Sequence, residues 1–482
     1  MKNKLKLCSF ADDDKNLTDV RSIAFADRAE TQFNFKLRRY QPSSQLAFTD
    51  TLASVHGMIV ESHPKNLCRA NPALAAVLGL VLSMVTLAEA AELSPLAPPP
   101  NWASLEPYQH TISRQEFTRL IDQVYSPDGA FWKFAKINDD RVMIFSDTDR
   151  TPPPLFTLYF APSESACAPL PYAYKTRAVS TDPSRPLKGL RIALDPGHIG
   201  GDWAKLEGRY FKIDDDPSVE EAKLNMITCN LLAERLQADG AEILWAKRDY
   251  EPTTDLRPDS LHREAIAALA FHPDTTKRKS DEAAIERMIS NEAALLFYRV
   301  AEIRARAELV NKQHPDLTIC VHYNADDWGD PNNPTLIGRS RLVIFINGSY
   351  EKGELAADDT KYDLLRKLLD RTAAQEERGC DLVGQEMLDT LKYPPEAYTG
   401  YFAHRVTHVP SVYARNLLAN RLYHGPVIYC EGPYMNARDA YYRIIAGDYL
   451  GLRTIQGESV PSIYREYAAS VERGILKYFG VK

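Results

Sequence analysis

From Gly189 to the end of the chain, short apolar runs alternate with longer amphipathic stretches. The runs are rich in aliphatic side chains, as buried strands are. They are "GLRIALD" (189–195), "AEILWAK" (241–247), "LTICVHY" (317–323), "RLVIFI" (341–346) and "PVIYCEG" (426–432). Because predicted strands alternate with predicted helices, we expect an α/β fold over residues 189–482. Its sheet should be open and mostly parallel, with helices on both faces.

The stretches between these runs have helical periodicity. One helix is expected over residues 221–237 and another at the C-terminus, each with apolar side chains on one face. Two more helical stretches, at about 259–271 and 281–311, flank the charge-rich segment "DTTKRKSDEAAIER". Such a segment suits solvent or a partner better than a core. We therefore interpret residues 258–300 as an insertion that covers the cleft, and as a candidate surface for a regulatory protein partner.

A smaller α+β domain is predicted over residues 103–180, after a Pro-rich linker at 91–102. Ser113 and Glu116 form a capping box that should open a helix over residues 114–124. Strand-like runs follow at 141–145 and 155–160. No motif in this domain points to catalysis, so its sequence does not indicate its role.

An apolar stretch, "ALAAVLGLVLSMVTLAEAAE", begins at Ala73. Its apolar core of roughly 16 residues is short for a membrane-spanning helix, which needs about 20. Lys65 and Arg69 precede it and the small-x-small site Ala88-Glu89-Ala90 follows, which is the order of a secretory signal peptide. We therefore interpret residues 58–90 as a signal peptide and expect a periplasmic or extracellular protein with no stable membrane span.

The leader lies unusually far from Met1. Residues 1–57 are polar, mixed in charge and without clear periodicity. A start at Met58 would give a signal peptide of ordinary length, so we interpret residues 1–57 as an N-terminal extension that a mis-assigned start would explain. A buried core helix and a long uncleaved anchor are the alternatives for the apolar stretch.

Composition narrows the class of protein. The chain has 482 residues, 44% of them hydrophobic, which is enough for two or three domains. A net charge of −7 without a long basic run argues against nucleic acid as the partner. Removing Cys8 and Cys68 with the leader leaves five of the seven cysteines, and none has CxxC spacing. The cysteines therefore predict neither a disulfide framework nor a zinc knuckle.

Four chemically active side chains stand at the ends of predicted strands or at the start of a helix. His198 follows one strand, His322 lies near the end of another, Glu431 ends a third, and Glu221 opens the helix after His198. In an open α/β sheet such positions meet at one edge. Two imidazoles and one carboxylate, with water in the fourth position, form the ligand set of a catalytic zinc site. A second carboxylate beside that water would accept its proton.

Five segments also carry a family resemblance. They are "IALDPGHIGG" (192–201), "EAKLNM" (221–226), "RAELVN" (306–311), "TICVHYNA" (318–325) and "PVIYCEGPYMN" (426–436). Their order resembles the motifs of the zinc-dependent N-acetylmuramoyl-L-alanine amidases of the amidase_3 type. The resemblance spans about residues 189–480.

The resemblance implies a substrate and a role for each residue. The substrate would be peptidoglycan, and the bond cleaved would be the amide between N-acetylmuramic acid and the first L-alanine of the stem. His198, Glu221 and His322 would carry over as ligands of Zn²⁺, and Glu431 as the catalytic carboxylate. The family spacing favours Glu221, with Glu220 as the alternative ligand. The segment between His198 and Glu221 is longer than the family pattern.

Other residues and other functions remain candidates. Asn324 follows His322 closely, and His404 stands four residues before His408 with Arg405 between them. We expect Asn324 and His404 to contact substrate rather than metal. The rival functions are a zinc peptidase that cuts within the stem peptide and an inactive wall-binding module.

Overall fold

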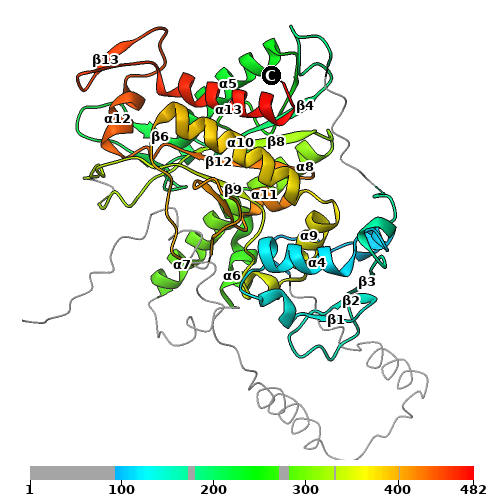
Figure 1. Cartoon of the computed structure of the whole chain (residues 1–482). Helices are drawn as coiled ribbons and strands as arrows, with labels where there is room; N and C mark the ends of the chain where they lie inside the picture. Colours follow the sequence, from blue (N-terminus) through cyan, green and yellow to red (C-terminus); the bar gives the residue numbers. More distant parts are fainter. Residues whose placement is uncertain (1–92, 172–179, 271–281, 331–332, 401, 482) are drawn as a thin grey trace, which may run out of the picture.

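The computed structural model describes residues 93–171, 180–270, 282–330, 333–400 and 402–481 (Figure 1). The predicted signal peptide and the N-terminal extension lie outside these ranges. Among the helices of the described ranges, none is both long and apolar enough to cross a membrane.

A seven-stranded sheet forms the centre of the molecule, and its strands run in the order β10-β11-β9-β12-β8-β4-β7. The strands are β4 (Arg191–Pro196), β7 (Glu242–Trp245), β8 (Leu317–Tyr323), β9 (Val343–Ile346), β10 (His404–Arg405), β11 (Val412–Ala414) and β12 (Val427–Gly432). Neighbours pair in parallel except at the β12–β9 and β10–β11 junctions. The prediction of an open, mostly parallel sheet is therefore confirmed.

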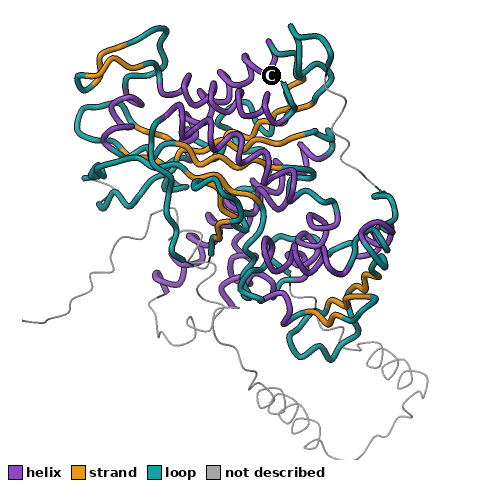
Figure 2. Tube along the Cα trace, viewed as in Figure 1, coloured by secondary structure: helices purple, strands orange, loops and turns teal. Residues whose placement is uncertain are grey.

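Helices cover both faces of this sheet (Figure 2). One face packs against α5 (Glu221–Ala238), α10 (Ala373–Leu391) and α13 (Ile463–Tyr478). Residues that alternate along each strand supply this core, because successive side chains of a strand point to opposite faces. The other face has a smaller apolar cluster, which includes Ala307 of α8 (Glu302–Asn311) and Ala419 of α11 (Leu418–Leu422).

The region before the main sheet has the expected α+β character. It contains α4 (Arg114–Leu120), a π turn (Ile121–Tyr125), and the antiparallel strands β1 (Ala135–Ile137), β2 (Arg141–Ile144) and β3 (Phe156–Tyr159). The Ser113 hydroxyl accepts a hydrogen bond from the Glu116 backbone at 3.2 Å, as a helix cap does. The Glu116 carboxylate instead binds Arg119, so only half of the capping box forms.

This region is joined to the main domain by backbone hydrogen bonds and by a shared core. The N–H groups of Ser349 and Tyr350 donate to the carbonyls of Val124 and Tyr125, at 2.8 and 2.6 Å. A single cluster of buried apolar side chains runs through both regions. The region therefore packs as a side layer on the main domain.

The insertion is helical, as expected. It contains α6 (His262–Ala270), α7 (Glu282–Leu295) and a π turn (Leu296–Ala301) that runs into α8. Further elements had no clear signal in the sequence: α9 (Asp358–Leu369), α12 (Arg438–Ile445), and the hairpins β5 (Tyr210–Phe211)–β6 (Val219–Glu220) and β13 (Arg453–Ile455)–β14 (Glu458–Val460). Short 3₁₀ turns complete the list: Trp102–Tyr108, Ala130–Lys133, Glu164–Ala166, Gly201–Trp203, Pro258–Leu261 and Glu354–Ala356.

Candidate metal centre

The candidate site lies at the edge of the sheet where β4, β8 and β12 end. On β8 and β12, His322 and Glu431 are register partners. Because paired residues of neighbouring strands point to the same face, both side chains face the same side of the sheet. The turn after β4 carries His198, and α5 begins at Glu221. Four residues that are far apart in sequence therefore meet at one edge.

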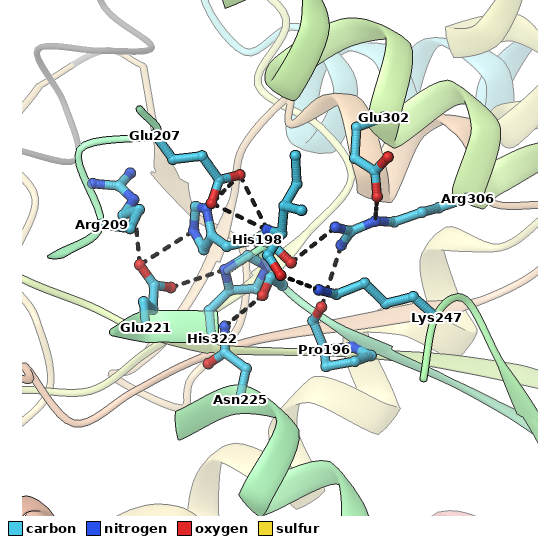
Figure 3. A network of polar contacts seen from close by, with 12 residues as sticks. Pro196, His198, Glu207, Arg209, Glu221, Asn225, Lys247, Glu302, Arg306 and His322 are labelled. Atoms are coloured by element: carbon cyan, nitrogen blue, oxygen red, sulfur yellow. Dashed lines mark hydrogen bonds and ion pairs between the residues drawn. The ribbon is translucent and has the colours of Figure 1, made fainter. Parts of the chain in front are cut away.

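Three of them form a compact group of metal-binding atoms. One ligand atom from each of His198, Glu221 and His322 lies within 4.8 Å of the others. The Glu221 carboxylate lies between the two imidazoles, with Oε2 3.2 Å from His198 Nε2 and Oε1 3.2 Å from His322 Nδ1 (Figure 3). Two imidazoles and one carboxylate suit a zinc ion with one position left for water. In the described part of the chain, no other group of three or more His, Cys, Asp or Glu side chains is close enough to hold a metal ion.

Glu220, the alternative ligand, points elsewhere. Its carboxylate binds the Lys223 ammonium at 2.7 Å. Of the two adjacent acids, Glu221 is therefore the one that the structure brings to the imidazoles.

Gly197 and His198 explain why the chain turns sharply after β4. A Cβ atom at Gly197 would lie 2.0 Å from Cε1 of His322, so a side chain there would collide with the second imidazole. His198 itself has a φ of 65°, a left-handed conformation that is uncommon outside glycine. Asn225 of α5 donates a hydrogen bond to the Gly197 carbonyl at 3.0 Å, which helps to hold the turn.

Arg306 of α8 supports the same turn from the other side (Figure 3). Its guanidinium is buried and donates to the His198 carbonyl at 2.9 Å, to Asp195 at 3.0 Å and to Glu302 at 2.7 Å. Burial opposes its charge, but Asp195 and Glu302 outweigh burial and raise the pKa of Arg306. Arg306 therefore remains charged, and its hydrogen bonds hold the backbone of the turn that carries His198.

Carboxylates also dominate the surroundings of His198. Burial would lower the pKa of this imidazole, but Glu221 and Glu207 outweigh burial and raise the pKa to about 9 in the metal-free protein. The pKa of Glu221 is lowered far below its usual value, because the neighbouring His198, His322 and Arg209 outweigh the effect of burial. In the metal-free protein, Glu221 is therefore ionised and available as a ligand.

Lys247 lies behind the same turn. Its ammonium donates to the Ile199 carbonyl at 2.7 Å. Burial, together with the nearby Arg306, lowers the pKa of Lys247 to about 7.

The cleft above the metal centre is lined by several elements. Besides the residues already named, its walls include Tyr298 and Arg299 of the π turn, Phe345, Tyr398, Arg415 and Tyr429. Glu431 and Asn324 also line it. The structure therefore brings Asn324 to the cleft, whereas His404 does not line it. His404 lies on the edge strand β10, where its Nδ1 contacts the Ser349 hydroxyl at 2.6 Å.

The insertion also packs against the turn that carries His198. Ile199, directly after His198, is buried in a small core that also contains Leu261, Ala265, Leu296 and Phe297. The insertion therefore supports the His198 turn as well as lining the cleft. The sequence predicted a cover or regulatory element, and support of the His198 turn was not part of that prediction.

Sequence reasoning missed Glu207, Arg209 and the role of Arg306. Arg306 belongs to the "RAELVN" segment, so its position in a recognisable motif was a usable signal. Glu207 and Arg209 lie in the long loop after His198, which has no periodicity that would indicate which side chains turn inward. Only the folded chain shows their positions.

The chain is similar to several solved structures at low sequence identity. No protein-family model matches the chain, and no curated protein matches it. Ami1 of Mycobacterium abscessus is 14% identical, with a TM-score of 0.34, and the match covers 60% of this chain and 99% of Ami1. CwlD of Clostridioides difficile, solved with the GerS lipoprotein, is 13% identical, with a TM-score of 0.33 and coverage of 61% and 100%. AmiC2 of Nostoc punctiforme is 14% identical, with a TM-score of 0.31 and coverage of 60% and 98%.

Ami1 and AmiC2 are N-acetylmuramoyl-L-alanine amidases, and CwlD is an amidase. At these identities and scores the likeness does not assign an activity to this chain. The assignment of function therefore depends on the geometry of the metal centre.

Proposed function

We propose that this protein is a zinc-dependent hydrolase that cleaves the amide between N-acetylmuramic acid and L-alanine in peptidoglycan. The observation that carries the proposal is the convergence of His198, Glu221 and His322 within 4.8 Å, at the base of a cleft that Glu431 also lines. Three protein ligands leave one position of a catalytic zinc ion open for water, and an additional carboxylate can accept the proton of that water.

His198, Glu221 and His322 would hold the zinc ion. When bound, zinc would supply the Lewis acidity that activates a water molecule and stabilises the negative charge of the transition state. The Glu431 carboxylate accepts the proton of the attacking water. It then delivers a proton to the departing L-alanine nitrogen, which is too basic to leave as an anion. Glu431 is placed for both steps, because it is the register partner of the ligand His322 and lines the same cleft.

The walls of the cleft suit an extended substrate of sugar and peptide. Tyr298, Tyr398 and Tyr429 offer aromatic surface, and Arg299 and Arg415 offer cationic groups. The Tyr429 ring stacks on the His322 imidazole with centroids 4.7 Å apart, so this wall extends directly from the metal centre. Asn324 supplies a polar group near the same base, and we assign it a contact with the substrate.

A cell-wall substrate requires export. We assign residues 58–90 to a signal peptide, on the basis of the basic, apolar and small-residue order of the sequence. Protein recovered outside the cytoplasm is expected to begin near Ala91. N-terminal sequencing of that protein checks this, and an intact residue 1–90 segment would contradict it.

Digestion of purified peptidoglycan tests the reaction. The proposed activity releases stem peptides with a free L-alanine amino group and leaves intact N-acetylmuramic acid on the glycan, both identifiable by mass. New ends within the stem peptide would instead identify a peptidase. No release by the zinc-loaded protein would indicate a binding module.

A further inference from the structure

The segment between His198 and Glu221 presents two charged side chains to the metal centre. We call residues 201–220 the hairpin arm, because they include the β5–β6 hairpin. We propose that the hairpin arm sets the zinc affinity of the site through two opposing residues. Glu207 strengthens zinc binding by orienting His198. Arg209 weakens zinc binding, because its guanidinium pairs with the Glu221 carboxylate that would otherwise bind the metal. The inference rests on the proposed metal-dependent function.

Strand register places Arg209 beside the ligand carboxylate. Tyr210 pairs with Glu220 in the antiparallel hairpin, and the Glu221 N–H donates to the Arg209 carbonyl at 3.2 Å. Arg209 therefore stands opposite Glu221 at the open end of the hairpin. Since α5 begins at Glu221, one short element fixes both the start of this helix and the approach of the guanidinium.

The hairpin arm is anchored at some distance from the metal centre. Phe211 is buried beside Trp328 and Tyr441, with ring centroids 5.1 and 6.1 Å apart. The Tyr441 hydroxyl donates to the Asp216 carboxylate at 2.9 Å. These contacts anchor β5 and the turn that follows it, so the hairpin arm is held in place by contacts other than those of Glu207 and Arg209 with the ligands.

Glu207 contacts the far side of the His198 ring. Its carboxylate oxygens accept the Ile199 N–H at 3.2 and 3.1 Å, and Oε1 lies 3.7 Å from His198 Nδ1 (Figure 3). His198 Nε2 is thereby directed at Glu221. A carboxylate behind a metal-binding imidazole fixes the ring and increases its basicity, so it strengthens metal binding.

Arg209 acts on the carboxylate ligand. Its Nε lies 3.2 Å from Oε2 of Glu221, the same oxygen that faces His198 Nε2. The other oxygen, Oε1, is independently held by His322 Nδ1 and by the Tyr323 N–H, at 3.2 and 3.3 Å. The orientation of Glu221 therefore survives without Arg209. What Arg209 contributes is a positive charge that repels an arriving zinc ion.

Zinc affinity distinguishes the two roles because the expected changes have opposite signs. The measurement is the zinc dissociation constant of the whole protein, by competition with a chromogenic chelator. Glu207→Gln keeps an acceptor for the Ile199 N–H but removes the charge, and should weaken zinc binding about 10–100-fold. Arg209→Gln should tighten zinc binding about tenfold. Arg209→Lys keeps the charge and should stay near the wild-type value.

Matched controls come from the same hairpin arm. Glu220→Gln removes a buried carboxylate that binds Lys223, and Lys212→Gln removes an exposed cation. Both should leave zinc affinity nearly unchanged. The melting temperature, measured with and without zinc, gives a second test that does not depend on turnover. The metal-free Arg209→Gln protein should melt below the wild type, because Glu221 has lost a cation, and zinc should raise its melting temperature by more.

Each result has a defined consequence. Weaker zinc binding by Arg209→Gln, or unchanged binding by Glu207→Gln, would overturn the inference. A wild-type protein that binds no zinc would overturn it together with the metal centre. If zinc affinities shift as expected while no wall amide is cleaved, the proposed function fails and the inference about the hairpin arm stands.

Discussion

His198 and His424 are both largely enclosed, but the charges around them have opposite signs. Around His198, Glu221 and Glu207 outweigh burial and raise the pKa of the imidazole to about 9. Around His424, burial and the nearby cations Arg366 and Lys367 lower the pKa to about 3. At neutral pH the imidazole among carboxylates carries a proton, which a metal ion would displace, whereas the imidazole among cations stays neutral.

The two histidines belong to two kinds of buried polar cluster. Near His424, Lys367 and Glu376 are fully buried and form an ion pair at 2.9 Å. Lys367 also donates to the Gly425 carbonyl, and Glu376 accepts the N–H groups of Asn347 and Val427. These bonds join α9 and α10 to the sheet and are directed inward. In the metal centre, by contrast, two imidazoles share one carboxylate beneath a cleft.

The contrast teaches that buried charge alone does not identify a functional site. What distinguishes the metal centre is convergence of several donors on one point and access from the cleft. Variants in the two clusters should therefore differ in what they change. Substitutions in the candidate metal centre should affect metal binding and turnover, whereas substitutions near Lys367 should affect the free energy of unfolding.

The largest effect is expected at the imidazole ligands. His322→Ala removes one of three ligands, so zinc binding should weaken by more than the 10–100-fold typical of outer-sphere changes, and turnover should vanish with it. Zinc content after dialysis and turnover on peptidoglycan check this. A His322→Ala protein that retains zinc and activity would show that the metal is bound elsewhere.

A large effect on turnover alone is expected at Glu431. Glu431→Gln preserves the shape of the side chain and much of its hydrogen bonding but removes the proton acceptor. General acid–base catalysis contributes about 10²–10⁴-fold, so the turnover rate should fall at least that far while the zinc content stays at the wild-type level. Loss of zinc from this variant would make Glu431 a ligand instead.

The Lys367–Glu376 pair should show the reverse pattern. Lys367→Met leaves the buried Glu376 without its cation and should lower the free energy of unfolding by about 3–5 kcal/mol. Zinc affinity of the folded protein should not change. The double variant with Glu376→Gln should recover much of the loss, because the amide keeps an acceptor for the backbone N–H groups. Denaturant unfolding of the single and the double variant measures these free energies. A loss of zinc affinity in either variant would show that the Lys367–Glu376 pair also supports the metal centre.

The smallest effect is expected from the titration of His424. Its pKa is about 3 in the folded protein and about 6.5 in an unfolded chain, so between these values the unfolded state binds more protons. Stability should therefore fall as the pH drops below about 6.5, by about 2 kcal/mol between pH 7 and pH 5. In His424→Gln this contribution should disappear. Equal pH dependence in both proteins would show that His424 does not contribute.

The sequence by itself determined the frame of the main domain. The apolar runs predicted at 189–195, 317–323 and 426–432 correspond to β4, β8 and β12, because continuous apolar runs this short are stable mainly as buried strands. Since the carboxyl ends of parallel strands lie at one edge, the convergence of His198, His322 and Glu431 could be predicted from their positions alone.

Other features depended on contacts that no local pattern encodes. β9 and β11 are short, and β9 runs antiparallel to β12, so periodicity could not assign their order in the sheet. His404 was expected at the substrate, but strand pairing with β11 places it at the far edge. The positions of Glu207 and Arg209 follow from the β5–β6 register and from the packing of Phe211, which join residues through tertiary contacts. Strand hydrophobicity is a local property and can be read from the sequence, whereas the neighbours of a loop side chain are set by how distant segments pack.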